Sequence, residues 1–484
     1  MTTEFSNYID GKWVPAQDGE TFEHQNPARL SDITGRFPLS KADDVNKAIT
    51  AAQNAFHGWA CTSPRERVNI LERALENMEQ RKENMAEILS RENGKTVAEA
   101  EGEIEYAISD MQFQLGEGLR LSGETVPVTI PNVHAYSVRE PVGIVGIITP
   151  WNFPFNVPTS KCVPALVAGC SVVFKPARLT PRTAIEFVKL FADAGVPPGV
   201  LNLIIGSGSE AGDALVCDER IDAISFTGST KVGKMINRKA AENLTRTQLE
   251  MGGKNAVVVL QDADLERAAE GTVAAAFGTA GQKCTATSRA IVTEDTADEF
   301  VDLLLEKAEA LTVGNGMDEG VDMGPVTGTR QMEKILEYIK IGKKEDAELV
   351  LGGEKLTGAD YDDGCFIAPT IFDHVTSDMT IAQEEIFGPV LCIERVSNFE
   401  EAVKVNNDVR YGLSASIYTE DLAKAHTFLH RAEVGVGHVN LMTALNEPQL
   451  SFGGMKESGF GLPEAGPEST EFYTEQKVSY ISYQ

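Results

Sequence analysis

The spacing of apolar residues predicts a helical region near the N-terminus, preceded by short strands. Residues 42–60 and 64–93 carry apolar side chains at helical spacing, and Ser63-Pro64 is a typical helix start. Ahead of them, residues 7–13 are expected to form a hairpin around an Asp-Gly turn.

From residue 141 onward, continuous apolar runs of strand length alternate with helices. Helices are expected to begin near Pro158, Pro181, Glu210 and Lys231, and strands are expected at 141–150, 171–176, 202–206, 223–228 and 255–260. Strands that are apolar on both faces and separated by helices are typical of a parallel sheet covered on both sides. This part of the chain is therefore predicted to be Rossmann-like.

A second α/β series follows the first. Helices are expected at 263–279, 297–311, 332–344 and 400–407, and strands at 288–293, 348–351, 367–372 and 390–395. Two further segments, 119–140 and 475–483, alternate apolar and polar residues. They are expected to be extended and to pair with each other away from the domain bodies. The expected fold class is therefore α/β.

Composition and charge narrow the function classes. The chain has 484 residues, 42% of them hydrophobic and 24% charged, as in globular proteins of two or three domains. Its formal net charge of −29 argues against nucleic acid or an anionic membrane as a partner. An anionic cofactor would therefore need a local cluster of cations or a helix N-terminus.

Cysteine usage and the first residues indicate the compartment. The seven cysteines are scattered and form no CxxC pair, so neither a disulfide framework nor a metal site is expected. The N-terminus lacks the features of a secretory signal, and no apolar run reaches the length of a membrane span. These observations predict a protein of the cytoplasm.

Cys284 is the first candidate for chemistry. It is surrounded by small residues in GTAGQKCTATSR, so a substrate carbonyl could approach its sulfur. A thiolate is a strong nucleophile for a carbonyl carbon, and backbone amides there could stabilise an oxyanion. The alternative is that Cys284 is a small buried hydrophobe.

Two more polar residues stand in apolar surroundings. Glu250 lies between Leu and Met just before an apolar strand, a setting that raises a carboxyl pKa and suits a general base. The alternative is a local cap or ion pair. Asn152 lies in TPWNFP at the end of a buried strand, where its amide could donate to an oxyanion. The alternative is an aromatic loop with a packing role only.

Three segments could bind a nucleotide. Lys175 follows a strand and could reach ribose or phosphate. Residues 226–233 read as a strand, a glycine turn and a helix N-terminus, which is an anion site without the GxGxxG fingerprint. The adjacent carboxylates Glu384 and Glu385 could hold ribose hydroxyls or form a charged turn.

Taken together and in this order, the segments PWNFP, FKPA, FTGST, LEMGGKN, GQKCTATSR and EEIFGP are highly specific. From about Tyr8 to Tyr480 the chain resembles the aldehyde dehydrogenase superfamily. The resemblance implies a dinucleotide-binding domain (1–118 and 141–249), a catalytic domain (250–445) and an oligomerisation arm (119–140 and 465–484). It also implies a homodimer or homotetramer.

The resemblance also implies residue roles. Cys284 matches the nucleophile, Glu250 the base that activates the deacylating water, and Asn152 the oxyanion donor. Lys161 and Glu464 resemble a proton-relay pair. The implied cofactor contacts are Thr149, Pro150, Trp151, Lys175, Ala177, Arg178, Gly208, Phe226, Gly228, Ser229, Val232, Gly252, Glu385 and Phe387. The implied substrate contacts are Phe153, Asn156, Ser160, Lys283, Thr285 and Phe452.

The implied reaction is oxidation of an aldehyde through a thiohemiacetal and a thioester on Cys284, with hydride transfer to NAD(P). Members that transfer the acyl group to coenzyme A typically lack a Glu at position 250, so its presence favours a free acid product. A coenzyme A-acylating enzyme and a non-enzymatic redox or structural protein on the same scaffold are the alternatives.

The chain departs from the family pattern at two places. Where NAD-preferring members usually carry Glu it has Arg178, which would attract a 2′-phosphate and favours NADP, unless the side chain points to solvent. Asn156 and Ser160 predict a wide, polar substrate tunnel, although the loop 441–450 contains no Arg to hold a distal carboxylate. GQKCTATSR and EFYTEQK resemble the α-ketoglutarate semialdehyde dehydrogenase branch.

Overall fold

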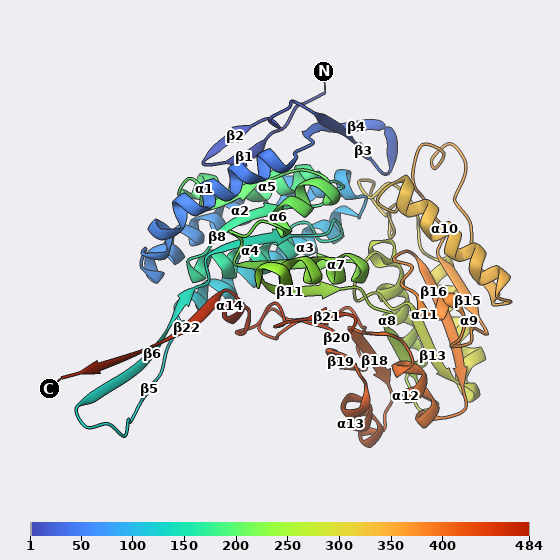
Figure 1. Cartoon of the computed structure of the whole chain (residues 1–484). Helices are drawn as coiled ribbons and strands as arrows, with labels where there is room; N and C mark the ends of the chain where they lie inside the picture. Colours follow the sequence, from blue (N-terminus) through green and yellow to red (C-terminus); the bar gives the residue numbers. More distant parts are fainter. Residues whose placement is uncertain (1, 484) are drawn as a thin grey trace.

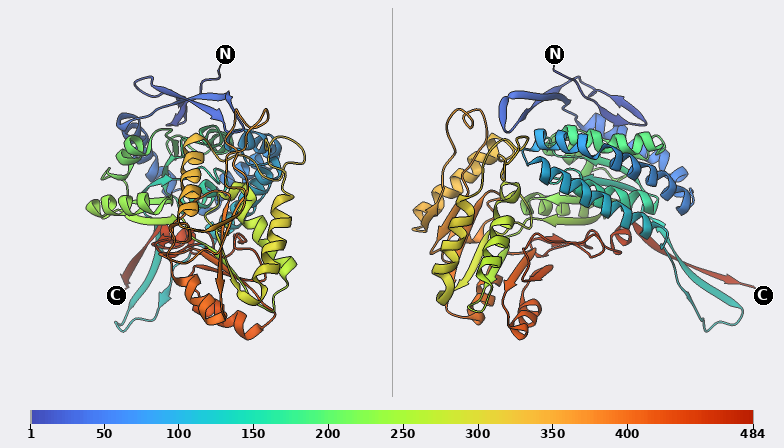
Figure 2. Two further views of the ribbon diagram at one scale, coloured as in Figure 1. Left: turned by 90° about the vertical axis from the view of Figure 1, so that its right-hand side faces the viewer. Right: turned by 180° about the vertical axis from the view of Figure 1, so that it is seen from behind.

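The computed structural model describes residues 2–483 and consists of two α/β bodies and a β arm that projects from them (Figures 1 and 2). The predicted α/β fold class is confirmed. Each body is built on one large sheet, and none of the described helices is both long and apolar enough to cross a membrane.

The first sheet has eight strands in the order β2-β1-β9-β8-β7-β10-β11-β21. They are β1 (Asn7–Ile9), β2 (Lys12–Val14), β7 (Ile144–Ile148), β8 (Ser171–Lys175), β9 (Leu201–Leu203), β10 (Ala223–Gly228), β11 (Arg246–Met251) and β21 (Gly459–Phe460). The strands from β9 to β11 are parallel, as the sequence predicts. The antiparallel hairpin of β1 and β2 continues the sheet beyond β9, and β21 pairs antiparallel with β11 at the other end.

Helices cover both faces of this sheet. One face carries α2 (Pro64–Asn93), α3 (Val97–Gly118), α4 (Asn156–Ala168) and α5 (Pro181–Ala194), and the other carries α1 (Ala42–Ala60), α6 (Asp213–Val216) and α7 (Thr230–Ala240). Alternate residues of β7 point to opposite faces, so Val145 and Ile147 join one core cluster while Ile144 and Ile148 join the other. This double burial explains the continuous apolar runs.

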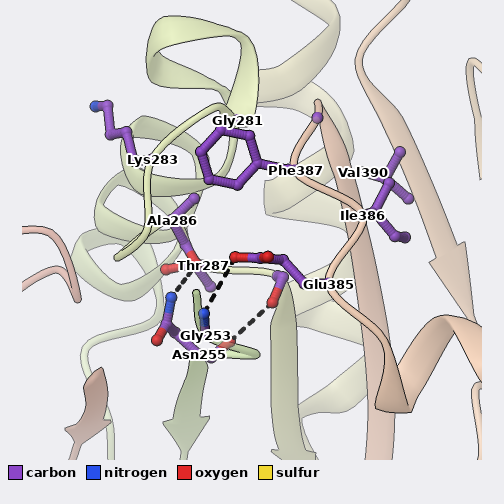
Figure 3. Close-up of a pocket in the computed structure, with 12 residues that line it drawn as sticks. Gly253, Asn255, Gly281, Lys283, Ala286, Thr287, Glu385, Ile386, Phe387 and Val390 are labelled. Carbon is purple, nitrogen blue, oxygen red and sulfur yellow. Dashed lines mark hydrogen bonds between the residues drawn. The ribbon is translucent and has the colours of Figure 1, made fainter. Parts of the chain in front are cut away.

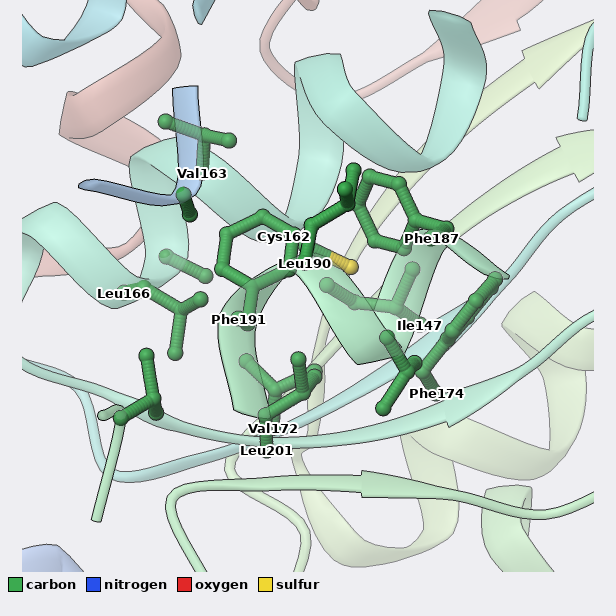
Figure 4. Packing of buried hydrophobic residues seen from close by; sticks show 14 of the residues in the cluster. Ile147, Cys162, Val163, Leu166, Val172, Phe174, Phe187, Leu190, Phe191 and Leu201 are labelled. Carbon is green, nitrogen blue, oxygen red and sulfur yellow. The ribbon is translucent and has the colours of Figure 1, made fainter. Parts of the chain in front are cut away.

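The first core cluster is dense in aromatic residues (Figure 4). Phe187 lies 5.0 Å from Phe191 and 5.9 Å from Phe174 between ring centroids, and all three are fully buried. Cys162 lies in the same cluster. It is a buried apolar residue here, which is the usual role of a free cysteine.

Local signals set the helix ends where the sequence places them. The side chain of Ser63 accepts from the amide of Glu66, and α2 ends at Gly94 with φ of 98°. The helical segment expected near Glu210 begins earlier, as a π turn over Gly208–Gly212 that leads into α6. The reason is that Ser207 Oγ accepts from the amide of Glu210 and caps the turn.

The second sheet has seven strands in the order β14-β15-β16-β13-β12-β18-β19. They are β12 (Ala256–Val259), β13 (Arg289–Thr293), β14 (Glu348–Leu351), β15 (Thr370–Asp373), β16 (Val390–Val396), β18 (Ser414–Tyr418) and β19 (Val436–Val439). Helices α8 (Leu265–Phe277), α9 (Glu294–Glu309), α10 (Thr329–Lys344) and α11 (Thr380–Gln383) pack on one face, and α12 (Phe399–Asn407) and α13 (Leu422–Arg431) on the other.

The remaining strands form three small sheets. The arm contains β5 (Thr125–Val126), β6 (Val133–Pro141) and β22 (Thr474–Ser482). The short helix α14 (Ser469–Phe472) precedes β22 in the chain. β22 pairs antiparallel with β6 over its whole length, so the pairing expected between the two extended segments is present. A hairpin of β3 (Thr21–Asn26) and β4 (Arg29–Pro38) and the pair β17 (Tyr411–Gly412) and β20 (Met455–Lys456) complete the fold.

Candidate active site

The two bodies enclose a cavity of about 790 Å³ to which most of the predicted site residues contribute. Its lining includes the candidates Asn152, Glu250, Cys284, Glu464, Pro150, Trp151, Gly228, Ser229, Gly252, Glu385, Phe387, Phe153, Asn156, Ser160, Lys283, Thr285 and Phe452. These residues come from the carboxyl ends of β7, β10 and β11 and from loops of the second body. The volume is that of a small-molecule site.

Cys284 follows a tight turn at the end of α8. Thr279 and Ala280 adopt φ of 54° and 52°, and a Cβ at Gly281 (φ 68°) would collide with the carbonyl of Gly388. The Cys284 carbonyl accepts from Asn255 Nδ2 at 2.8 Å, which fixes the backbone behind the thiol. Burial and the nearby carboxyls, first that of Glu464, raise the pKa of the Cys284 thiol to about 12.

Glu250 lies at the end of β11 and reaches the same cavity. It is 4% exposed, and its Oε2 has no hydrogen-bond partner among the described residues. Burial and the Glu464 carboxyl raise the pKa of Glu250 well above its usual value, against the opposing effect of Lys161. A carboxyl with a raised pKa and one oxygen without a partner is suited to accept a proton.

Behind Glu250 runs a buried chain of polar contacts. Lys161 Nζ forms an ion pair with Glu464 at 2.6 Å and donates to Ser225 Oγ at 2.9 Å. Ser225 Oγ in turn donates to Gln248 Oε1 at 2.7 Å. The backbone pairing of Glu464 with Phe452 places both residues at the cavity wall. Lys161 itself does not line the cavity and acts on it through Glu464.

Asn152 is held from two sides. Its Nδ2 donates to the Gln282 carbonyl at 3.0 Å, two residues before Cys284, and its own carbonyl accepts from Lys95 Nζ at 2.8 Å. Lys95 forms a fully buried ion pair with Glu103 at 2.5 Å. The other oxygen of Glu103 accepts from the amides of Phe155 and Asn156 and so caps α4.

The candidate cofactor residues form two groups. Near Cys284, Glu385 Oε1 accepts from the Gly253 amide at 3.1 Å, and a Cβ at Gly252 would collide with the same carboxylate (Figure 3). Phe387 packs edge-on against Trp151, with 5.4 Å between ring centroids. The glycine therefore lets the Glu385 carboxylate pack directly against the backbone of the first body.

The second group follows the ends of β7, β8 and β10, and of its members only Ser229 lines this cavity. Ser229 is the N-cap residue of α7 and makes no side-chain cap bond, so the first amides of that helix are available to an anion. Burial lowers the pKa of Lys175 to about 8, and its Nζ donates to the Pro176 carbonyl at 3.0 Å. The other candidates there are Thr149, Ala177, Arg178, Gly208, Phe226 and Val232.

These residues fit a dinucleotide. The buried hydroxyls of Thr149 and Thr227 have no partner among the described residues. The absence of a side chain at Gly228 and Gly252 lets Phe226 and Glu385 pack closely against the backbone there. A free helix N-terminus and a buried lysine lie along the same edge of the sheet. Together they supply a hydroxyl-binding carboxylate, a phosphate-binding helix end and a cation.

Several residues of the site were not predicted from the sequence. Besides Lys95 and Glu103, the face of α3 brings Tyr106 and Asp110 to the cavity. Burial raises the pKa of Asp110 to about 7, and its Oδ2 has no partner among the described residues. Arg289, by contrast, is buried away from the cavity against Glu394. Residues 2–483 contain no cluster of side chains suited to a metal ion.

A cysteine and a carboxyl beside one cavity, next to residues that fit a dinucleotide, are what an oxidoreductase of this kind requires. Comparison with known proteins gives the family. A model of the aldehyde dehydrogenase family matches residues 13–479. The chain is 43% identical to an alpha-ketoglutaric semialdehyde dehydrogenase of Bacillus subtilis (99% of this chain, 98% of the relative). It is 42% identical to an alpha-ketoglutarate semialdehyde dehydrogenase of Haloferax volcanii (100% of both chains).

Solved structures agree with this comparison. A betaine aldehyde dehydrogenase mutant of Staphylococcus aureus, in complex with NAD⁺, matches with a TM-score of 0.96 at 33% identity (100% of this chain, 98% of that chain). An NAD-dependent aldehyde dehydrogenase of Sinorhizobium meliloti matches with a TM-score of 0.96 at 36% identity (100% and 95%). The chain belongs to the aldehyde dehydrogenase family and is an NAD(P)-dependent enzyme that oxidises an aldehyde.

Proposed function

We propose that this enzyme converts a semialdehyde with a distal carboxylate into the free dicarboxylic acid through a thioester on Cys284. The observation that carries the proposal is that Cys284 and Glu250 reach the same cavity, and that Oε2 of Glu250 has no partner among the described residues. Three relatives that are 42–43% identical are named for alpha-ketoglutarate semialdehyde or 2,5-dioxopentanoate. We propose this compound as the first substrate to test.

In the first half-reaction the Cys284 sulfur forms a bond to the aldehyde carbon. The thiol proton leaves the sulfur, and the carbonyl oxygen becomes the hydroxyl of a thiohemiacetal. Asn152 Nδ2, which already points toward the segment before Cys284, donates to that oxygen as charge develops on it. A bound nicotinamide dinucleotide supplies the hydride acceptor. Loss of hydride and a proton from the thiohemiacetal leaves a thioester on Cys284.

In the second half-reaction Glu250 accepts a proton from water, whose oxygen attacks the thioester carbon. The carbon–sulfur bond breaks, the acid leaves, and the proton returns to the sulfur. The chain from Glu464 through Lys161 to Ser225 is positioned to carry protons away from Glu250. Glu464 thus takes part in proton transfer next to Glu250, while Lys161 positions Glu464.

Product analysis tests this function against its alternatives. With an aldehyde panel that includes dicarboxylic semialdehydes, we expect the free acid as the product whether or not coenzyme A is present. An acyl-coenzyme A product would instead identify a coenzyme A-acylating enzyme. Full turnover by Cys284→Ser would contradict the thioester mechanism, and loss of turnover with retained cofactor binding would support it.

We infer a preference for NADP from Arg178. Its guanidinium is exposed, lies 5.3 Å above the Phe22 ring and forms no ion pair within 4.0 Å among the described residues, so it is available to a 2′-phosphate. Arg178→Glu should shift the ratio of specificity constants toward NAD. Arg238→Glu, on the exposed face of α7, is the matched control for net charge. An unchanged ratio in Arg178→Glu would contradict the inference.

We further propose the domain roles that the family resemblance implies: cofactor binding by 1–118 and 141–249, catalysis by 250–445, and oligomerisation by 119–140 and 465–484. β22 is an edge strand with exposed Val478, Tyr480 and Ile481, a surface that a second copy could cover. Removal of residues 475–484 should lower the native mass from a homodimer or homotetramer to that of smaller species. The seven free cysteines support our proposal of a cytoplasmic location.

A further inference from the structure

The cavity that receives the substrate is rich in acidic groups. Glu99, Glu103 and Asp110 line it along one face of α3, and Glu250 and Glu464 line it near Cys284. The whole chain also carries a net charge of −29. A substrate with a distal carboxylate, as in the proposed function, therefore needs a compensating cation inside this cavity.

Most buried cations near the cavity are already paired. Lys95 pairs with Glu103 and Lys161 with Glu464, and neither lysine lines the cavity. The lining lysines are Lys283 and Lys334. Lys334 belongs to the cofactor side, because its Nζ lies 3.4 Å from the Glu385 carbonyl and 5.6 Å from the ring centroid of Tyr338.

Lys283 has no such partner. No hydrogen bond or ion pair of its Nζ is found among the described residues, and burial lowers the pKa of its ammonium. Its Nζ lies beside Gly278 and near Glu99, but the Glu99 carboxylate already accepts from the amides of Thr96 and Thr279. Figure 3 shows the Lys283 side chain extending away from Glu385 and Phe387.

Two other unpartnered groups of the cavity favour a polar ligand over an alkyl one. Asp110 Oδ2 and Asn156 Oδ1 are buried without a partner, and Asp110 is fully buried. A polar substrate that occupies the cavity would contact these atoms, whereas a plain alkyl aldehyde would leave them unsatisfied. The amide of Asn156 can present either its oxygen or its nitrogen to such a substrate.

We propose that Lys283 binds the distal carboxylate of the substrate and so sets the preference of the enzyme for carboxylate-bearing aldehydes. This inference rests on the proposed function. The loop 441–450 contains no arginine for this purpose, and Lys283 supplies the charge next to the nucleophile in the sequence. The ammonium attracts the carboxylate and orients the aldehyde end toward Cys284.

The test compares two substrates of equal length, a terminal-carboxylate semialdehyde and its primary amide. The measured quantity is the ratio of their kcat/KM values. In Lys283→Met we expect this ratio to fall by about 10- to 100-fold, the factor expected for one hydrogen bond to a charged group. Lys283→Arg should restore most of the preference, and Lys334→Met should keep the wild-type ratio.

The outcomes separate the inference from the proposed function. If the wild-type enzyme prefers the acid and Lys283→Met keeps that preference, the assignment of Lys283 is wrong. If the wild-type enzyme oxidises other aldehydes but not the acid semialdehyde, the proposed substrate class is wrong whatever Lys283 does. Cofactor binding and thermal unfolding establish that each variant is folded. Lys283→Gln replaces Lys283→Met if the latter does not fold.

Discussion

The strongest test of the mechanism is replacement of the base, Glu250→Gln. Gln has nearly the same shape as Glu, and Oε2 of Glu250 makes no hydrogen bond among the described residues, so the substitution removes no recorded side-chain partner of that atom. The side chain packs against Gly453, where an ideal Cβ would lie 3.1 Å from Oε1. The variant should therefore fold and bind cofactor like the wild type.

The expected defect lies in the second half-reaction. A positioned general base contributes roughly 10²- to 10⁴-fold to a rate, so steady-state turnover should fall by that factor. Formation of the thioester does not require activation of water. Rapid mixing with aldehyde and cofactor should therefore give a burst of about one reduced nicotinamide per active site, as covalent catalysis predicts.

Hydroxylamine provides the decisive addition. It attacks thioesters without a general base, and it should restore turnover in Glu250→Gln while Cys284→Ala stays inactive. Denaturation during the burst should also trap an acylated Cys284. Unchanged turnover in Glu250→Gln would refute the role of this residue. If Glu250→Gln binds cofactor but gives neither a burst nor an acyl adduct, the assignment of thioester formation to Cys284 and of hydrolysis to Glu250 is wrong.

Other predictions concern the surroundings of the site. Lys161→Met leaves the buried Glu464 unpaired and should lower the free energy of unfolding by about 3–5 kcal/mol. The double variant Lys161→Met/Glu464→Gln should recover stability, and equal unfolding temperatures of the two variants would contradict this. Phe187→Ala should cost about 3–5 kcal/mol in urea unfolding, and a loss below 1 kcal/mol would show that the core collapses around the gap. Because the pKa of Cys284 is raised to about 12, iodoacetamide should alkylate the free enzyme about tenfold faster per unit of pH between roughly 7 and 10. A plateau at neutral pH would contradict that protonation state.

The elements that the sequence predicts well are those with strong local signals. The helices 42–60 and 64–93 have the predicted bounds. For the second helix a capping serine, an N1 proline and a terminal glycine act within a few residues of its ends. The parallel sheet follows from apolar runs that are buried on both faces. The π turn at Gly208–Gly212 was expected only as a helix, because its winding depends on the capping geometry at Ser207.

The site residues follow the same rule. Cys284, Glu250 and Asn152 stand in recognisable motifs, and the structure brings all three to one cavity. Lys95 and Glu103 were missed, although they hold the loop that carries Asn152. No local pattern marks their role, because the loop that they hold lies more than 50 residues further along the chain. Asp110 was missed for the same reason, since only tertiary packing brings it to the cavity.

The buried lysines show how an acidic chain can bind two anions. Lys95 and Lys161 each have a carboxylate partner, and these pairs serve the fold and the base. Lys175 and Lys283 have none among the described residues, and burial lowers the pKa of both. Lys175 is 5% exposed and Lys283 is half-buried. An ammonium largely removed from water without a counterion is unfavourable, which points to an anion that arrives from outside. We therefore expect the cofactor to supply the anionic partner of Lys175 and the substrate carboxylate to supply that of Lys283. Cofactor alone should then change the pKa of Lys175, and the pKa of Lys283 should change only when the substrate is also bound.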